Sequence, residues 1–332
     1  MSIKYESAPI GKQGLCAIWT QIFPGKPKYT EKDYPKLDGK VVIVTGANAG
    51  VGYEVTKSLL GSTNAKVYMF TRNKQKTIDA IKKLEIEVAS EYNKKNLKVD
   101  YITIDFSDLT TIKPAADEFL SKESRLDIII HNAGVMAPPI GSVSKQGFEL
   151  QLGTNVLGPH LLQKYLDPLL IKTSHTNKPG ETRIVWVASS GQYFSPIGGV
   201  HYEDPNFTNT PNVSKMQIYG QSKALNVLQA KGWNSAHPDG SNVISVSLCP
   251  GALKTELQRH STPSEAFMSK FILHEARLGA YTELFAALSP DIRSGDHVEC
   301  FGKKTRARKD LEDPKAISKG WDFVEENLKP YL

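Results

Sequence analysis

Seven short apolar runs, separated by segments with helical periodicity, constrain the fold of this chain more than any other feature. The first run, residues 41–45, consists entirely of β-branched residues, which is typical of a strand buried on both faces of a parallel sheet. Residues 73–91 and 148–170 have the periodicity of helices. Strands that alternate with helices predict an α/β fold with a doubly wound (Rossmann) parallel sheet of about seven strands. The predicted strands are 41–45, 65–70, 99–104, 126–130, 183–187, 243–248 and 297–301.

The predicted strands follow one another without a linker, so residues 38–302 are expected to form a single catalytic domain. Residues 1–37 contain four prolines and predict an N-terminal arm, and residues 303–332 form a C-terminal extension. Within the domain, residues 191–217 are rich in glycine and proline and predict a substrate loop. Residues 253–280 carry apolar side chains and predict a lid over the substrate.

Composition excludes several classes of protein. The 41 Lys and Arg exceed the 35 Asp and Glu by only six, a bias too small to indicate a nucleic-acid partner. Cys16, Cys249 and Cys300 are far apart in the sequence, so neither a disulfide framework nor a metal site is expected. No apolar run approaches the ~18 residues of a transmembrane helix. We therefore expect a cytoplasmic protein.

A glycine-rich segment, T-G-A-N-A-G-V-G, occupies residues 45–52 between the first predicted strand and the following helix. Glycines allow a tight turn there and let the backbone approach a pyrophosphate, whose charge the helix N-terminus stabilises. The segment therefore predicts a dinucleotide site. The residues expected to contact the cofactor are Gly46, Asn48, Gly50, Val51 and Gly52.

The spacing T-G-x-x-x-G-x-G resembles that of the short-chain dehydrogenase/reductase family, and further motifs follow in that family's order along residues 40–302. They are Asn132-Ala133-Gly134, Asn155, Ser189-Ser190, Tyr219-x-x-x-Lys223, and Pro250-Gly251 with Thr255. The resemblance implies an oxidoreductase that binds NADP(H) through these motifs. The long loop after Ser189 resembles the retinol-dehydrogenase and carbonyl-reductase-like branch, which includes fungal members. That branch implies hydrophobic ketones, aldehydes or secondary alcohols as substrates.

The Tyr219 and Lys223 side chains are expected on one face of a helix, where the ammonium would lower the pKa of the phenol from its usual value of about 10. Tyr219 would then pass its proton to a carbonyl oxygen as a hydride arrives, while Ser189 holds that oxygen. Ser190 is the alternative serine. The resemblance implies that Asn155 fixes a water connecting Lys223 to solvent. An exposed helix face is the alternative explanation for an isolated Tyr-x-x-x-Lys pair.

Arg72 ends the second predicted strand, and no acidic residue occurs between positions 67 and 78. A guanidinium pairs with a ribose 2′-phosphate, whereas a carboxylate binds a free ribose, so Arg72 predicts NADP(H) as the cofactor. A solvated arginine at a strand end is the alternative. The resemblance implies that Asp105 holds the adenine, with a helix N-cap as the alternative.

Other classes of function stay open at this point. A non-catalytic NADP-binding regulatory or scaffold protein would have the same fold. A sugar-nucleotide epimerase would require an added C-terminal domain, and only about 30 residues follow the last predicted strand. His131 is expected to be a packed residue, and the basic run 303–309 a solvated segment.

The N-terminal arm contains apolar residues at partly helical spacing. They are Ile10, Leu15, Ile18, Trp19, Ile22 and Phe23. A short amphipathic helix is expected, which either packs on the domain or enters a membrane or lipid-droplet surface. The resemblance also implies a homo-oligomer as one alternative.

Overall fold

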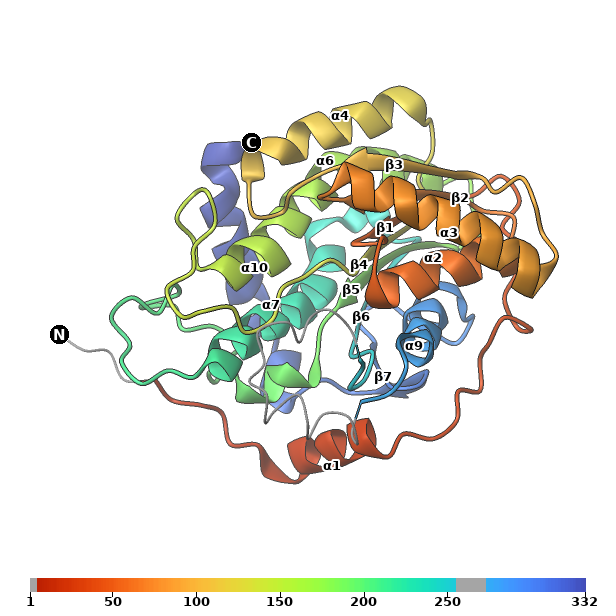
Figure 1. The fold of residues 1–332 in the computed structure, drawn as a ribbon. Helices are drawn as coiled ribbons and strands as arrows, with labels where there is room; N and C mark the ends of the chain where they lie inside the picture. Colours follow the sequence, from red (N-terminus) through yellow and green to blue (C-terminus); the bar gives the residue numbers. More distant parts are fainter. Residues whose placement is uncertain (1–4, 255–272) are drawn as a thin grey trace.

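The computed structural model describes residues 5–254 and 273–332, and its centre is one eight-stranded sheet with the order β3-β2-β1-β4-β5-β6-β7-β8 (Figure 1). All neighbouring strands are parallel except β7 and β8. Every residue of β1, β4, β5 and β6 is buried, as expected for strands covered by helices on both faces. The strands are β1 (Val41–Thr45), β2 (Lys66–Thr71), β3 (Val99–Thr103), β4 (Ile128–His131), β5 (Thr182–Val187), β6 (Val243–Leu248), β7 (His297–Glu299) and β8 (Lys303–Thr305).

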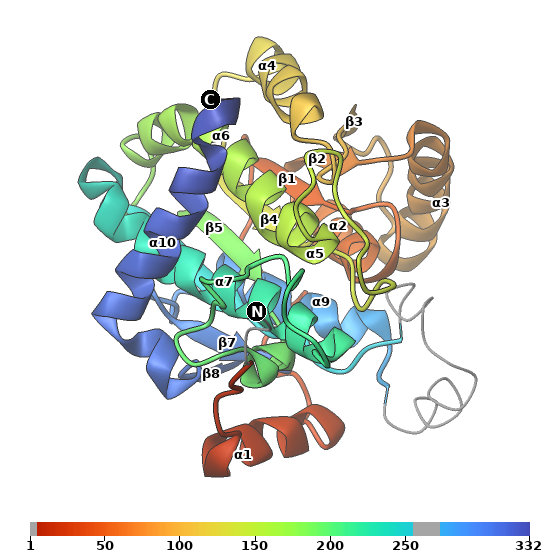
Figure 2. The same ribbon diagram turned by 90° about the vertical axis from the view of Figure 1, so that its left-hand side faces the viewer.

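Helices cover both faces of the sheet and divide the core in two (Figure 2). One face packs against α2 (Gly50–Ser62), α3 (Lys74–Tyr92) and α9 (Ala276–Leu288). The other packs against α4 (Ile112–Lys122), α6 (Gly158–Ser174), α7 (Lys215–Ala236) and α10 (Pro314–Leu328). Three further helical elements are α1 (Gly11–Ile22), α5 (Leu150–Leu152) and the π-helix η2 (Gly153–Leu157). The predicted single-domain Rossmann fold is confirmed.

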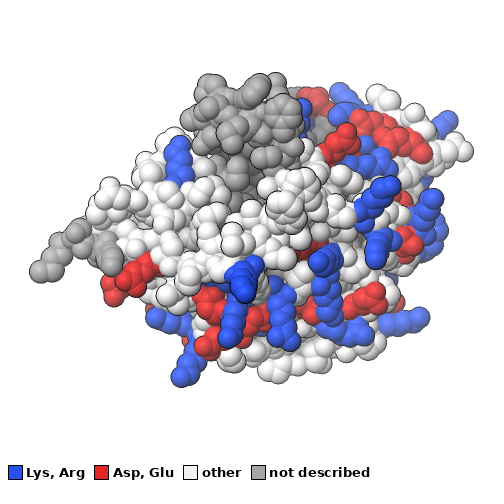
Figure 3. All heavy atoms as spheres, turned by 90° about the horizontal axis from the view of Figure 1, so that it is seen from below, with Lys and Arg blue, Asp and Glu red and all other residues white. Residues whose placement is uncertain are grey.

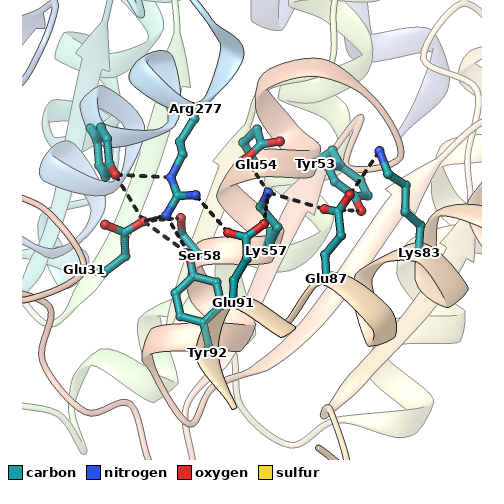
Figure 4. A network of polar contacts seen from close by, with 11 residues as sticks. Glu31, Tyr53, Glu54, Lys57, Ser58, Lys83, Glu87, Glu91, Tyr92 and Arg277 are labelled. Carbon is teal, nitrogen blue, oxygen red and sulfur yellow. Dashed lines mark hydrogen bonds and ion pairs between the residues drawn. The ribbon is translucent and has the colours of Figure 1, made fainter. Parts of the chain in front are cut away.

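A network of ion pairs joins three helices to the N-terminal arm (Figure 4). The guanidinium of Arg277, on α9, lies 2.9 Å from carboxylate oxygens of both Glu31 in the arm and Glu91 on α3. Lys57, on α2, contacts Glu91 at 3.2 Å and Glu87 at 3.3 Å. Because several charges share these contacts, the network orients α2, α3 and α9 relative to one another better than an isolated surface pair would.

The C-terminal part differs from the sequence-based predictions at two points. The sheet has an eighth strand, β8, formed by the first residues of the basic run. The run is solvated at Lys303, Lys304, Arg306 and Lys309, as predicted. Arg308 departs from the prediction, because it is buried and donates to the carbonyl oxygens of Gln192, Ser195 and Pro196. A buried guanidinium needs such acceptors to replace water. Arg308 thereby fixes the start of the predicted substrate loop.

The predictions for the N-terminal arm and for His131 are confirmed. The amphipathic helix of the arm is present as α1. His131 is a packed residue, its ring stacked on that of Trp186 at 4.4 Å, and burial lowers its pKa to about 4.

Thr255 and most of the predicted lid lie within residues 255–272, outside the described part of the chain. Among the described helices, none has the length and apolar character to cross a membrane.

Glu283 is a fully buried carboxyl group on the face of α9 that packs against the sheet. Neither of its carboxyl oxygens has a hydrogen-bond partner among the described residues. Burial raises the pKa of Glu283 to about 8 from an ordinary value of 4.5. The folded protein therefore binds this proton more tightly than the unfolded chain does. The contribution of the proton to the unfolding free energy is complete below pH 4.5 and is lost as the pH rises towards 8.

Replacing Glu283 with Gln should remove this pH dependence, because an amide does not ionise. Between pH 4.5 and 8, we expect ionisation of Glu283 to lower the unfolding free energy of the unaltered protein by up to about 1.4 kcal/mol for each unit that the pH rises. Urea unfolding at a series of pH values measures the slope. Glu85→Gln, at an exposed position, is the control. Equal slopes in all three proteins would show that Glu283 ionises normally.

Candidate active site

The glycine-rich turn after β1 brings the backbone of three segments very close together. Gly46 has a φ of +68°, which a residue with a side chain adopts only with strain. At Gly52, a Cβ atom would lie 2.5 Å from Asn132 Nδ2 and 2.7 Å from the carbonyl oxygen of Gly46. Both positions therefore require glycine, and the turn has the shape that the sequence predicted.

The same turn is joined to the end of β4. Asn132 Nδ2 donates to the carbonyl oxygen of Thr45 at 2.8 Å, and the Ala133 amide donates to Thr45 Oγ1 at 2.9 Å. From β1 the chain continues to β2 and β3 on one side, and the later strands lie on the other side. The carboxyl ends of β1 and β4 thus flank the point where the strand order reverses, which is where doubly wound sheets bind ligands.

A cleft with a volume of about 220 Å³ lies at this point. The first turn of α2 lines it, and the first backbone N–H groups of the helix have no partner within the helix. The N-cap residue makes no side-chain cap, and the turn has no acidic residue. Such a helix end favours an anionic group. The lining includes most of the predicted cofactor-binding residues, namely Gly46, Asn48, Gly50, Val51, Arg72, Asp105, Asn132, Ala133 and Gly134.

Arg72 and Asp105 lie at the edge of the cleft where the adenine half of a dinucleotide is expected. Arg72 is exposed, and no ion pair with a carboxylate is found for it in the described part of the chain. One Asp105 oxygen accepts from the amide of Ser107 at 2.9 Å and from its hydroxyl at 2.7 Å. Asp105 therefore both lines the cleft and stabilises a local turn. Asn73, next to Arg72, caps α3 through a bond from the Lys76 amide.

The predicted catalytic side chains converge beyond the other end of the cleft. Tyr219 and Lys223 lie on α7, and the ammonium nitrogen is 5.8 Å from the centre of the phenol ring. The Tyr219 ring packs on Gly191, where a Cβ atom would come within 2.8 Å of it. Asn155, on η2, borders Gly134: a Cβ atom there would lie 3.1 Å from Asn155 Oδ1. The cleft therefore leads directly to this group.

Ser189 is the serine that lies beside Tyr219. The hydrogen bond with its hydroxyl lowers the pKa of the phenol, against the larger effect of burial, which raises it. Its Oγ also accepts from the Gly191 amide at 3.1 Å. The amide and the hydroxyl of Ser190 instead interact with the sulfur of Cys249. This arrangement favours Ser189 over Ser190 for contact with a substrate oxygen.

The predicted lowering of the Tyr219 pKa is wrong for the site as the structure shows it. Burial raises the pKa of Tyr219 above its ordinary value. The Lys223 ammonium points elsewhere, donating to the carbonyl oxygen of Val187 at 2.7 Å and to Asn226 Oδ1 at 3.2 Å. Burial also lowers the pKa of Lys223 to about 8. At neutral pH, Tyr219 is therefore a protonated acid beside a charged lysine.

Asn226 is a site residue that the sequence analysis missed. Its Oδ1 accepts from Lys223, and its Nδ2 donates to the carbonyl oxygen of Asn155 at 2.8 Å. The Asn155 side chain is itself bound to Val135 and Ser222, so it holds η2 against the segment after β4. Asn226 thus makes a direct connection between Asn155 and Lys223. Its position three residues after Lys223 on a helix was the available signal.

The described residues directly after β6 do not line the cleft. Gly251 has a φ of +110°, and a Cβ atom there would lie 3.1 Å from Cys300 Cβ. Pro250 and Gly251 are not among the residues that line the cleft. Their predicted contact with a cofactor stays a prediction. Among the described residues, no group of His, Cys, Asp and Glu could hold a metal ion.

The chain is similar in sequence to known proteins. The family model described as short chain dehydrogenase matches residues 40–203. The short-chain dehydrogenase/reductase pkfC of Emericella nidulans is 39% identical, over 92% of this chain and 98% of that protein.

Solved structures show the same fold. An uncharacterised protein from Mycobacterium paratuberculosis is 25% identical, with a TM-score of 0.65, covering 90% of this chain and 96% of its own. The NADPH-bound carbonyl reductase from chicken fatty liver is 21% identical, with a TM-score of 0.59, covering 81% of this chain and 99% of its own.

Replacing Asn226 with Leu should leave the carbonyl oxygen of Asn155 and the ammonium of Lys223 each short of a buried partner. We expect the unfolding free energy to fall by about 1–3 kcal/mol for each group left unsatisfied. Asn226→Asp is the matched variant, because it keeps the acceptor for Lys223 and removes only the Nδ2 donor, which serves the carbonyl oxygen of Asn155 and Gln229 Oε1. Its loss, measured by urea unfolding, should be smaller. A leucine variant as stable as the unaltered protein would contradict the assignment.

Proposed function

This chain belongs to the short-chain dehydrogenase/reductase family of oxidoreductases, and on that premise we propose that it transfers a hydride between NADP(H) and a hydrophobic ketone, aldehyde or secondary alcohol. The observation that carries the proposal is the convergence of Ser189, Tyr219, Lys223 and Asn155 at the end of a cleft whose glycine turn fits a dinucleotide. The preference for apolar substrates rests on the resemblance of the long loop after Ser189 to the retinol-dehydrogenase and carbonyl-reductase-like branch.

The residues of the cleft fit NADP(H). Gly46 and Gly52 let the turn pack tightly against the segment after β4, and the N-terminus of α2 offers backbone N–H groups to a pyrophosphate. Arg72 offers a guanidinium to a 2′-phosphate, since no carboxylate of the described residues forms an ion pair with it. A bound nicotinamide supplies or accepts the hydride. The chicken fatty liver carbonyl reductase, which shares this fold, holds NADPH.

The chain's own side chains move the proton. Because burial keeps Tyr219 protonated at neutral pH, its hydroxyl is ready to donate to a carbonyl oxygen that gains negative charge. Ser189 Oγ donates to the same oxygen and so fixes its position. Lys223, held by Val187 and Asn226, keeps a positive charge close to the developing phenolate. This distribution of protons favours reduction of a carbonyl at neutral pH.

The direct test is the loss of the near-ultraviolet absorbance of NADPH when a panel of apolar ketones and aldehydes is added. A catalytic protein oxidises NADPH with at least one member of the panel. A non-catalytic NADP-binding scaffold binds the cofactor and gives no turnover with any of them.

Replacing Tyr219 with Phe should separate binding from chemistry. The phenol hydroxyl is the proposed acid, so we expect kcat to fall by roughly 10²-fold to 10⁴-fold while the Kd for NADPH changes little. Tyr202→Phe is the control, because the Tyr202 hydroxyl is buried without a hydrogen-bond partner among the described residues. Near-full activity of Tyr219→Phe would refute the role of this tyrosine.

Replacing Arg72 with Asp should move the preference from NADPH towards NADH. A charge-assisted bond of about 1.5–3 kcal/mol corresponds to a ratio of kcat/KM values of roughly tenfold to more than a hundredfold. The change should appear chiefly in KM, because the 2′-phosphate contact is the same in the ground state and the transition state. Lys95→Asp makes the same charge change at an exposed position outside the cleft lining. Equal use of NADH and NADPH by the unaltered protein would overturn the assignment.

A further inference from the structure

The helix α1 carries a line of large apolar side chains that face solvent. Leu15, Trp19 and Phe23 are 63%, 64% and 62% exposed. Leu15 and Trp19 lie four residues apart on α1, and Phe23 is its C-cap residue, so the three follow one another along one side of the helix. The rings of Trp19 and Phe23 are 4.7 Å apart. We call these three residues the α1 stripe.

The opposite face of α1 is fixed to the domain, so the stripe is not the result of a loosely placed arm. Gly14, Ala17 and Gln21 are buried. A Cβ atom at Gly14 would lie 3.0 Å from the Tyr193 ring, so only a bare backbone fits there. Gln13 Nε2 donates to the carbonyl oxygen of Ala307 at 2.8 Å. Because these contacts set the rotation of the helix, the stripe points outward in the folded protein.

Figure 3 looks onto the face that carries α1 and shows a broad area without charged side chains, with charges gathered along its edges. Lys12, Lys26 and Lys28 belong to α1 or to the chain just after it and are exposed. Arg306 is exposed as well, and its carbonyl oxygen accepts from Gln13. Within residues 5–254 and 273–332, we find no ion pair for any of these four cations. Their charge is therefore available to an external anion.

We propose that α1 docks the protein on an anionic phospholipid surface, with the α1 stripe entering the boundary between headgroups and acyl chains. An amphipathic helix with Leu, Trp and Phe on one face and lysines beside it is the form of an interfacial helix. The lysines near the surface add electrostatic attraction to anionic lipid. Three apolar side chains are few, so docking should be reversible and should depend on that attraction.

A lipid surface explains the stripe better than a second copy of the chain does. In a two-fold symmetric pair, the stripe of one copy would meet the stripe of the other, and the surrounding cations would face like charges. The chain also has a net charge of +6, which adds to that repulsion. An anionic membrane has the opposite sign.

The docking surface lies next to the candidate active site. α1 packs on η3 (Ser190–Phe194), the 3₁₀ turn that directly follows Ser189. Docking would therefore bring the site close to a pool of apolar molecules. This link to catalysis rests on the proposed function, whereas the docking itself does not.

The test uses the full-length protein with phosphatidylcholine vesicles that contain or lack phosphatidylserine, kept reduced because Cys16 is exposed on α1. Trp19 is well suited as a probe, since Trp186 and Trp233 are fully buried and Trp321 is partly buried. We expect flotation with the anionic vesicles, less flotation at high salt, and quenching of Trp19 fluorescence by brominated acyl chains. Trp19→Phe should keep most of the flotation and lose the quenching.

The decisive variant replaces all three residues of the α1 stripe with Ser, and it should lose flotation while keeping NADPH binding and its melting temperature. The matched control makes the same change at three exposed isoleucines elsewhere, Ile86, Ile140 and Ile197. The proposal is overturned if the unaltered protein does not float at low salt, or if both triple variants lose flotation equally. It is also overturned if sedimentation shows a dimer that the stripe variant abolishes and the vesicles do not bind.

Discussion

The junction between the carboxyl ends of β1 and β4 is the constraint on which the site depends. Thr45 uses both its hydroxyl and its carbonyl oxygen to bind the chain after β4, through Ala133 and Asn132. Gly52 has to be bare because Asn132 Nδ2 already fills the space next to it. The two strands are therefore held at a fixed separation where the strand order reverses. The cleft and the N-terminus of α2 lie at this junction, which is where doubly wound sheets bind ligands.

The second fixed region is the polar core behind Lys223. From Asn226 the hydrogen bonds continue to Gln229, from Gln229 to His160 Nδ1 at 3.1 Å, and from His160 Nε2 to Glu325 on α10 at 2.9 Å. The bond with His160 lowers the pKa of Glu325 to about 2. A buried polar chain is costly unless each member is satisfied, so its members depend on one another. The C-terminal helix α10 is thereby tied to the lysine of the site, although it lies far from it in the sequence.

Sequence patterns gave the sheet, the glycine turn and the Tyr219–Lys223 pair, because each depends on local periodicity or on residues a few positions apart. They did not give β8, since three residues of a basic run carry no strand signal before they pair with β7. The burial of Arg308 was missed for a similar reason: its acceptors come from a loop more than a hundred residues away. The direction of the Tyr219 pKa was wrong because helical spacing places Lys223 on the same face but does not reveal that Val187 and Asn226 compete for its ammonium.

Burial sets the protonation of the site more strongly than charge pairing does. Desolvation lowers the pKa of Lys223 to about 8 and raises the pKa of Glu283 to about 8. The electrostatic attraction between the two groups acts in the opposite direction on each pKa but is the smaller effect. Below pH 8, Lys223 is charged, Glu283 is neutral and Tyr219 keeps its proton, so the region carries one positive charge. Above pH 8, both Lys223 and Glu283 lose a proton and the region becomes negative, which opposes the formation of a phenolate. The charge on this region therefore opposes loss of the Tyr219 proton less below pH 8 than above it.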